Sequence, residues 1–366
     1  MSERLVLALH CETLEMPNTF SVPVFSRLAD LLAAAPKAEL HVHIEGTLEA
    51  EMAFVIADRN AITLPFESPA AMRKTFGFTS LQSFLDVYYA AASVLRTEED
   101  FFDLAWAYFL RIKNDNVVHA EIFFDPQTHT SRGVAFQTVA QGLCRAIEKA
   151  RCELGISAML ILCFLRHLSQ REAFETLEQA QPFLQNVIAV GLDSSERGNP
   201  AEKFTDVFAA CRRLGLHAVA HAGEEGPAAS ITNTLECLHV ERIDHGVACL
   251  KDKAVVNRLV REQIPLTVCP LSNVKLRVFG RMADHNLPQL LDAGLRVSVH
   301  SDDPAYFGGY LNHNLLEAFS SLPLSATDAY TLLRNSFQSS FLQQSEKERH
   351  ISRLSEVFAE QRFHPS

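Results

Sequence analysis

The chain has 366 residues, of which 48% are hydrophobic and 21% are charged, and its formal net charge is −11. This charge repels phosphate backbones and anionic lipids, and no lysine- and arginine-rich run offsets it, so we expect neither nucleic acid nor a membrane as partner. The apolar share is enough for one large core. A small neutral substrate is compatible with this composition.

The eight cysteines are scattered and form no Cys-x-x-Cys motif. A chain of this size does not need disulfides, so we expect reduced thiols in a cytoplasmic protein, with the nucleus as a further location. Residues 1–20 carry only a short apolar run and are expected to form a disordered N-terminal extension. We expect residues 21–350 to form one domain and residues 351–366 a C-terminal tail.

Short runs rich in β-branched and apolar residues alternate with helical patterns along the chain, which favours a parallel sheet. Eight such runs favour an α/β fold of the (β/α)8 barrel type over a doubly wound open sheet, which is the structural alternative. The candidate strands are Ala38–Ile44, Val117–Phe124, Ser157–Leu165, Val187–Ser194, His217–Gly223, Glu241–Val247, Pro265–Leu271 and Arg296–Asp302.

The segment Glu45–Asn116, between the first two strands, is too long for a simple crossover. Its aromatic and apolar residues indicate extra helices inserted after the first strand. Such an insertion lies over the mouth of a barrel, where it forms either a lid or a purely structural cover.

Polar residues follow most of the strand candidates, at the end where barrel enzymes place their active sites. His41 and His43 alternate along one strand and therefore share a face. Alone, this pair is a weak signal, because two partly exposed histidines would look the same. Together with His221 and Asp302, at two further strand ends, it predicts a site for one Zn²⁺ per chain with a position left for water.

Three further residues surround these candidate ligands in the sequence. Glu224 follows His221 across a glycine and can shuttle protons if its pKa is raised, although a solvated loop acid is the alternative. His245 ends another strand, where a histidine bonded only to backbone is the alternative. Asp303 can project toward a substrate, or it can belong to an ordinary acidic turn before a proline.

Four segments together resemble the motifs of the adenosine/adenine deaminase family, within the amidohydrolase superfamily of metal-dependent hydrolases. The resemblance runs from about Pro36 to Phe337, and the segments around Glu121–Gly133 and Cys269–Leu276 are most similar to adenine deaminases, the fungal type especially. The segments are Pro36–Thr47, His221–Pro227, Arg242–Gly246 and Ser301–Pro304.

The resemblance implies that His41, His43, His221 and Asp302 bind zinc. It also implies that Glu224 donates a proton to purine N1, that His245 orients the attacking water, that Asp303 bonds N7, and that Gly191 presents its backbone to the purine edge. The reaction would convert adenine and water to hypoxanthine and ammonia, with zinc activating the water. Cytidine-type deaminases are excluded, because they need a Cys-x-x-Cys motif.

The substrate could be the free base or the nucleoside. Adenosine deaminases usually carry Asp two residues after the second histidine, whereas this chain has Glu45 there. A longer carboxylate would disfavour ribose and could bond the N9–H or N3 edge of the base, so we expect adenine as substrate. The alternatives are that Glu45 only braces the loop, or that the substrate is adenosine or an N6-substituted adenine.

A different hydrolase on the same scaffold, or a metal-binding protein without activity, would be expected to lack part of the Glu224, His245 and Asp303 set. The chain also departs from the family where it has His300 before Ser301, since the family usually has Asn there. We expect His300 to be a barrel histidine with satisfied hydrogen bonds rather than a partner of the metal ligands.

Overall fold

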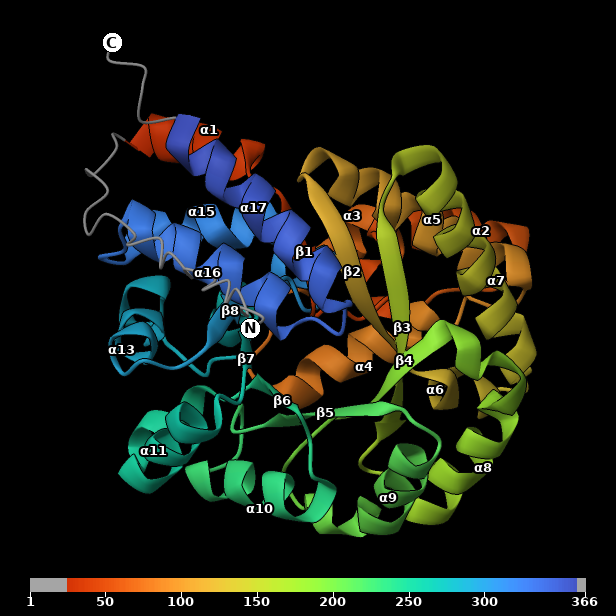
Figure 1. Ribbon diagram of the computed structural model, residues 1–366. Coiled ribbons are helices and arrows are strands. Elements are labelled where there is room, and N and C mark those ends of the chain that lie inside the picture. The colour runs from red at the N-terminus through yellow and green to blue at the C-terminus, as the bar shows by residue number, and fades with distance from the viewer. Residues whose placement is uncertain (1–24, 361–366) are drawn as a thin grey trace, which may run out of the picture.

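The computed structural model describes residues 25–360, and the expected N-terminal extension therefore lies outside the described residues. Within them, eight parallel strands pair in the order of the sequence, and helices surround the sheet (Figure 1). The strands are β1 (Lys37–Glu39), β2 (Val117–Phe124), β3 (Ser157–Leu165), β4 (Val187–Asp193), β5 (His217–Ala222), β6 (Arg242–His245), β7 (Leu266–Val268) and β8 (Val297–Val299).

The sheet closes between its first and last strands. Beyond β1 the chain continues extended, and Val42 forms a parallel bridge with Asp302. The His43 amide donates to the Asp302 carbonyl (3.0 Å), and the Asp302 amide donates to the His41 carbonyl (2.9 Å). The predicted (β/α)8 barrel is therefore confirmed, and its closure joins three of the candidate metal ligands.

Crossover helices follow the strands, and the predicted helical segments lie over them. Ser169 and Asp252 cap two of these helices with their side chains, and three short helices at strand ends begin with proline, which removes a free amide of the first turn. The crossover helices are α7 (Phe136–Lys149), α8 (Gln170–Ala180), α9 (Thr205–Arg213), α10 (Ala228–Leu238), α11 (Lys253–Glu262) and α13 (Leu287–Asp292), and three short helices at strand ends are α6 (Pro126–Thr130), α12 (Pro270–Lys275) and α14 (Pro304–Phe307).

The insertion after the first strand is helical, as expected. Its last helix, α5, packs against α7 as part of the outer layer, whereas α4 places aromatic and aliphatic side chains over the barrel mouth. The inserted helices are α2 (Ala50–Arg59), α3 (Pro69–Lys74), α4 (Leu81–Ala92) and α5 (Glu98–Asn114).

The remaining helices are α1 (Phe25–Ala34), α15 (Leu311–Ser321), α16 (Ala326–Ser339) and α17 (Gln344–Glu360). Helix α17 runs through residue 350, where the sequence analysis placed the start of a tail. It continues because Leu354, Val357 and Phe358 are buried, and α17 packs against α16. A helix with such an apolar face is stabilised by the body it packs on.

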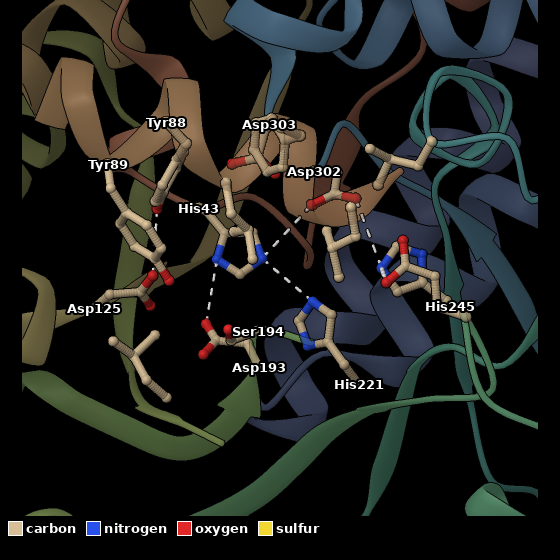
Figure 2. A pocket seen from close by; sticks show the side chains of 16 residues that line it. His43, Tyr88, Tyr89, Asp125, Asp193, Ser194, His221, His245, Asp302 and Asp303 are labelled. Carbon is tan, nitrogen blue, oxygen red and sulfur yellow. Dashed lines mark hydrogen bonds and ion pairs between the residues drawn. The ribbon is translucent and has the colours of Figure 1, made fainter. Parts of the chain in front are cut away.

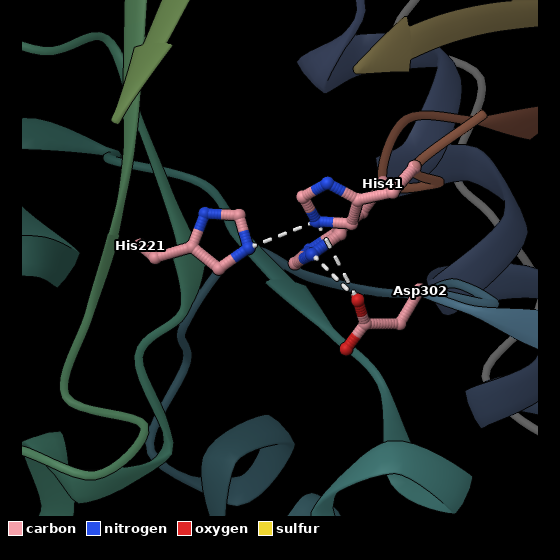
Figure 3. Close-up of side chains that lie close together, drawn as sticks. His41, His221 and Asp302 are labelled. Atoms are coloured by element: carbon pink, nitrogen blue, oxygen red, sulfur yellow. Dashed lines mark hydrogen bonds and ion pairs between the residues drawn. The ribbon is translucent and has the colours of Figure 1, made fainter. Parts of the chain in front are cut away.

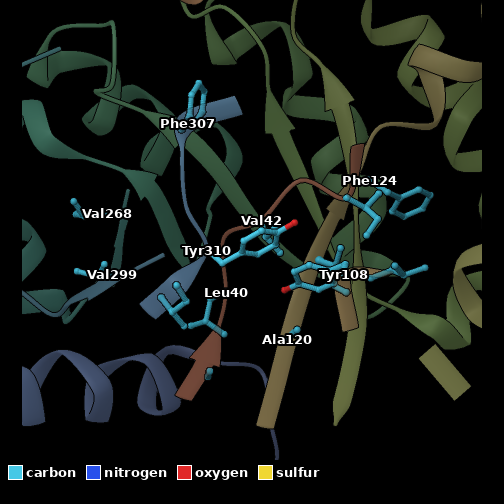
Figure 4. Close-up of a cluster of buried hydrophobic side chains, with 14 of the residues drawn as sticks. Leu40, Val42, Tyr108, Ala120, Phe124, Val268, Val299, Phe307 and Tyr310 are labelled. Atoms are coloured by element: carbon cyan, nitrogen blue, oxygen red, sulfur yellow. The ribbon is translucent and has the colours of Figure 1, made fainter. Parts of the chain in front are cut away.

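Alternation along the first strand separates the core from the site. Leu40 and Val42 are fully buried in the layer between barrel and helices, near Tyr108 of α5 and Tyr310 (Figure 4). His41 and His43 lie on the opposite face, toward the barrel axis. The apolar residues thus anchor the strand while the two histidines point inward.

Candidate metal and deamination site

A pocket opens at the carboxyl ends of the strands. Its polar residues come from the ends of β2, β4, β5, β6 and β8 and from the segment after β1, and α4 supplies the apolar wall (Figure 2). This is the position at which barrel enzymes bind their substrates. None of the described helices is long and apolar enough to cross a bilayer.

The four predicted metal ligands meet at one point in this pocket. Single ligand atoms of His41, His43, His221 and Asp302 all lie within 4.8 Å of one another. The Nε2 atoms of His43 and His221 are 3.3 Å apart, and Asp302 Oδ1 lies 3.6 Å from Nε2 of both His41 and His43 (Figure 3). All four side chains are buried.

Acceptors lie behind two of the histidines, at hydrogen-bond distance from His41 and at ion-pair distance from His221. Thr267 donates its hydroxyl proton to Asp244 (2.8 Å) and therefore accepts from His41 Nδ1 at 3.0 Å. The other Asp244 oxygen lies 3.6 Å from His221 Nδ1. With the Nδ1 proton directed at these partners, Nε2 of each ring keeps its lone pair for a metal.

The surroundings of the four candidate ligands fit a divalent metal ion. His43 Nδ1 faces Asp193 Oδ2 at 3.5 Å, so all three imidazoles have an acceptor behind them. His41 Nε2 is buried and has no hydrogen-bond partner among the described residues. Burial, together with the neighbouring histidines, holds the pKa of His41 and of His221 well below the usual range, so both rings are neutral, the form in which imidazole binds a metal.

Glu224 lies on the turn after β5 and lines the pocket. Burial, and then the charges of Asp302 and Glu196, raise the pKa of its carboxyl well above the usual range. The turn is fixed by Glu196, whose carboxylate accepts from the amides of Gly223, Glu224, Glu225 and Gly226, each at 2.9 Å. Glu224 is therefore a neutral carboxylic acid on a turn that the Glu196 carboxylate holds in place.

A chain of hydrogen bonds sets the tautomer of His245. The Leu287 amide donates to His285 Nδ1 (3.0 Å), so the proton of the neutral His285 ring is on Nε2 and is donated to Asn273 Oδ1 (3.2 Å). Asn273 therefore turns its amide nitrogen to His245 Nδ1 (3.3 Å). The proton of His245 is then on Nε2, which lies 3.6 Å from both Glu224 and Asp302.

Asp303 lies beside the metal group, and burial and the Asp302 charge raise the pKa of its carboxyl well above the usual range. Its Oδ1 is buried without a hydrogen-bond partner. A Cβ at Gly46 would lie 1.9 Å from this oxygen, so the position requires glycine. Asp302 and His245 have left-handed φ values of 63° and 65°, a strained backbone that is typical of functional sites.

Two of the expected substrate contacts lie away from the lining of the pocket. Glu45 Oε1 accepts from the Asp125 amide (3.2 Å) and from His129 Nε2 (2.8 Å), so this carboxylate braces the loop after β2. Gly191 lies inside the barrel on β4, where a Cβ would come within 2.6 Å of Cys163 Sγ. Glu45 thus holds the loop after β2, and Gly191 allows a close approach to Cys163, while the contact of either residue with substrate stays a prediction.

His300 lies below the site, outside the group of ligands. Its Nδ1 is 3.1 Å from Glu39 and from the Leu40 amide, and its Nε2 is 2.8 Å from the Ser298 hydroxyl. These partners satisfy the ring within the barrel, so its departure from the family pattern leaves the ligand group unchanged.

Several residues that line the pocket have no role that was predicted from the sequence. Among them, Asp125 and Asp193 are almost fully buried, and Tyr88 and Phe84 extend from α4. Asp193 lies at the end of a predicted strand, and a polar residue at that position indicates a site residue. The residues of α4 could not be found in this way, because their distance from the pocket depends on how the insertion folds back.

Comparison with known proteins agrees with this geometry. The family model described as adenosine deaminase matches residues 36–357. Two bacterial relatives named adenine deaminase, from Trichlorobacter lovleyi and Geotalea uraniireducens, are each 60% identical, with 91% and 92% of this chain and 96% and 95% of theirs covered. The crystal structure of adenine deaminase from Arthrobacter aurescens has a TM-score of 0.87 and 49% identity, covering 88% of this chain and 99% of that one. The chain belongs to the adenosine deaminase family of the amidohydrolases.

Proposed function

We propose that this protein is a zinc-dependent hydrolytic deaminase that converts adenine and water to hypoxanthine and ammonia. The observation that carries the proposal is the convergence of His41, His43, His221 and Asp302 next to the neutral acid Glu224, in one pocket. The names of the relatives and of the solved structure support adenine as the substrate.

Three imidazoles and one carboxylate favour zinc, and four protein ligands leave a position for water. When bound, zinc would supply an activated water molecule at neutral pH. The remaining steps belong to the side chains of the chain itself.

Glu224 would donate its proton to purine N1, which makes C6 more electrophilic. His245 carries its proton on Nε2, so it would orient the water by donating a hydrogen bond. Asp302 Oδ2, which faces His245 at 3.6 Å, would then accept the proton of the water. Asp303 would donate to N7. The C6–N6 bond would then break as Asp302 passes its proton to the exocyclic amine, which leaves as ammonia, and the hydroxyl proton at C6 would return to Glu224.

The wall formed by α4 would keep bulk water from the ring. Leu81, Phe84 and Leu85 line the pocket from this helix and are almost fully buried. An apolar wall strengthens each hydrogen bond to the base, because it lowers the local dielectric constant.

Assaying adenine and adenosine side by side, at equal concentrations of zinc-loaded enzyme, tests the proposal. We expect loss of adenine absorbance with formation of hypoxanthine, and little turnover of adenosine. Faster turnover of adenosine or of an N6-substituted adenine would overturn the choice of substrate.

A further inference from the structure

Two carboxyl groups at one end of the pocket take no part in the chemistry described so far. Asp125 follows β2 and Asp193 ends β4, and both line the pocket with 3% and 2% of their surface exposed. Figure 2 shows them on one side of His43, whereas Asp302 and His245 lie on the other. They therefore face the part of a bound ring that is farthest from its reacting carbon.

The rest of the protein offers few hydrogen-bond donors to this pair. Asp125 Oδ2 accepts from the Tyr88 hydroxyl at 3.3 Å, and Asp193 has hydrogen-bond contacts with Asp125 and with the Cys163 thiol. Asp125 Oδ1 is buried and accepts no other hydrogen bond from the described residues. Asp193 Oδ2 is turned to His43 Nδ1 at 3.5 Å. A buried carboxylate with so few donors is costly, and Asp125 Oδ1 has acceptor capacity left for a donor on the ligand.

We propose that Asp125 accepts a hydrogen bond from N9–H of the free purine base, with Asp193 completing the acidic end of the pocket, and that this contact excludes N9-substituted purines. The inference rests on the proposed function. N9–H lies on the imidazole ring, away from the N1 and C6 atoms that meet Glu224 and the metal site. A nucleoside has a glycosidic bond at N9 in place of this donor.

The fold holds Asp125 rigidly for this task. Its backbone amide donates to Glu45 Oε1 (3.2 Å), and Glu45 is in turn held by His129 (2.8 Å). His129 Nδ1 accepts from Arg132 at 2.7 Å. Glu45 is therefore a positioning residue, which acts on the base through Asp125.

The group formed by His43, Asp125 and Asp193 is also compact enough to hold a cation, since single ligand atoms lie within 4.8 Å of one another. Its one nitrogen ligand belongs to a ring whose Nε2 already faces the first metal site. A second ion would place two divalent charges on either side of one imidazole. The donor N–H of a base is the better match.

A buried acceptor that receives no hydrogen bond from a ligand strongly disfavours binding of that ligand. A pocket built to receive a hydrogen bond rejects an analogue without the donor by about 10⁴-fold or more when the contact is fully buried. A methyl group at N9 would also approach two acidic side chains without any compensating contact. We therefore expect wild-type enzyme to prefer adenine over 9-methyladenine by at least about 10³-fold.

The experiment compares Asp125→Ala and Asp125→Asn with wild type and with Asp86→Asn, a change of an exposed carboxylate on α4. The kcat/KM for adenine and for 9-methyladenine is measured, together with zinc content and thermal unfolding. Asp125→Ala should lower kcat/KM for adenine about 10²-fold and leave that for 9-methyladenine unchanged or raised. Asp125→Asn keeps one acceptor and should lie between, and Asp86→Asn should match wild type.

Calorimetric binding of hypoxanthine and 9-methylhypoxanthine to the same zinc-loaded proteins gives a readout that needs no turnover. The preference for hypoxanthine should be lost in Asp125→Ala. A preference that survives in both Asp125 variants would overturn the subsite. If the wild-type chain binds two metal ions and Asp125→Ala binds one, the proposed N9–H subsite would be overturned, because the acidic end of the pocket would then hold a cation. Tight, Asp125-dependent binding of hypoxanthine without deamination of adenine would overturn the proposed function but not the subsite.

Discussion

At the scale of single residues, Glu224 is a carboxylic acid kept neutral by burial and by two neighbouring carboxylates. Glu224→Gln keeps the size of the side chain but cannot give up a proton. We expect kcat to fall by about 10²–10⁴-fold, the usual contribution of a positioned acid, with zinc content unchanged. Steady-state kinetics and metal analysis check this.

The next residue supplies a matched control. Glu225 bonds Ser195 (3.1 Å) and pairs with Arg197 (3.4 Å) instead of facing the ligands. Glu225→Gln should therefore keep most of the wild-type kcat. An equal loss in both variants would mean that the turn, and not the proton of Glu224, carries the effect.

The tautomer of His245 gives a second prediction at this scale. Asn273→Asp removes the amide that donates to His245 Nδ1 and moves the ring proton from Nε2 to Nδ1. The proton aimed at Glu224 and Asp302 would be lost, and kcat should fall by about 10²-fold with little change in KM. Wild-type kcat in this variant would contradict the proposed tautomer.

At the scale of elements, the loop after β4 holds the turn after β5 through one carboxylate. Glu196→Gln places an NH₂ group against backbone amides that now donate to an anion, so the turn should loosen. We expect faster hydrogen exchange at residues 224–226 and a kcat about tenfold lower, the effect of losing about 1.4 kcal/mol. Glu202→Gln, at an exposed position, should change neither.

The positions of the strands and the shared face of two candidate ligands could be predicted, because both follow from local rules. Alternation along the first strand put His41 and His43 on one face and Leu40 and Val42 on the other, as the structure has them. Apolar runs set the positions of the strands to within a few residues. The first strand is shorter than predicted, because the chain after Glu39 meets its neighbours only through isolated bridges.

The rest of the site depends on contacts between residues far apart in the sequence. Nothing near Glu196 indicates that it binds the amides of a turn about thirty residues later. Glu45 was expected to bond the base, and nothing near it in the sequence indicates that its carboxylate also accepts from the Asp125 amide and from His129. Such contacts are set by tertiary packing and not by periodicity.

At the scale of the whole molecule, an ion pair crosses the lower barrel. Burial would raise the pKa of Glu121, but Arg242 at 2.6 Å and the bond from His119 outweigh it and lower that pKa to about 2. Because the folded pKa lies below the unfolded value, this group stabilises the fold above pH about 4.5, and the stabilisation is lost as the pH falls toward 2.

The loss of this stabilisation at low pH can be measured by urea unfolding of wild type and Glu121→Gln at pH 6 and pH 3. At pH 6 the variant should be less stable by about 3 kcal/mol, since it leaves Arg242 without its buried partner. The difference should shrink at pH 3. A constant difference across this range would contradict the assigned pKa.

The central claim is that four side chains from distant strands hold one zinc ion that the reaction needs. The measurement is zinc per chain, and turnover of adenine, in wild type, His221→Ala and His217→Ala, the last being a partly exposed histidine on the same strand. We expect one zinc ion per chain and full turnover in wild type and His217→Ala, and neither zinc nor turnover in His221→Ala. In wild type, a chelator should abolish turnover and added zinc should restore it. Equal zinc content in His221→Ala and wild type would contradict the site.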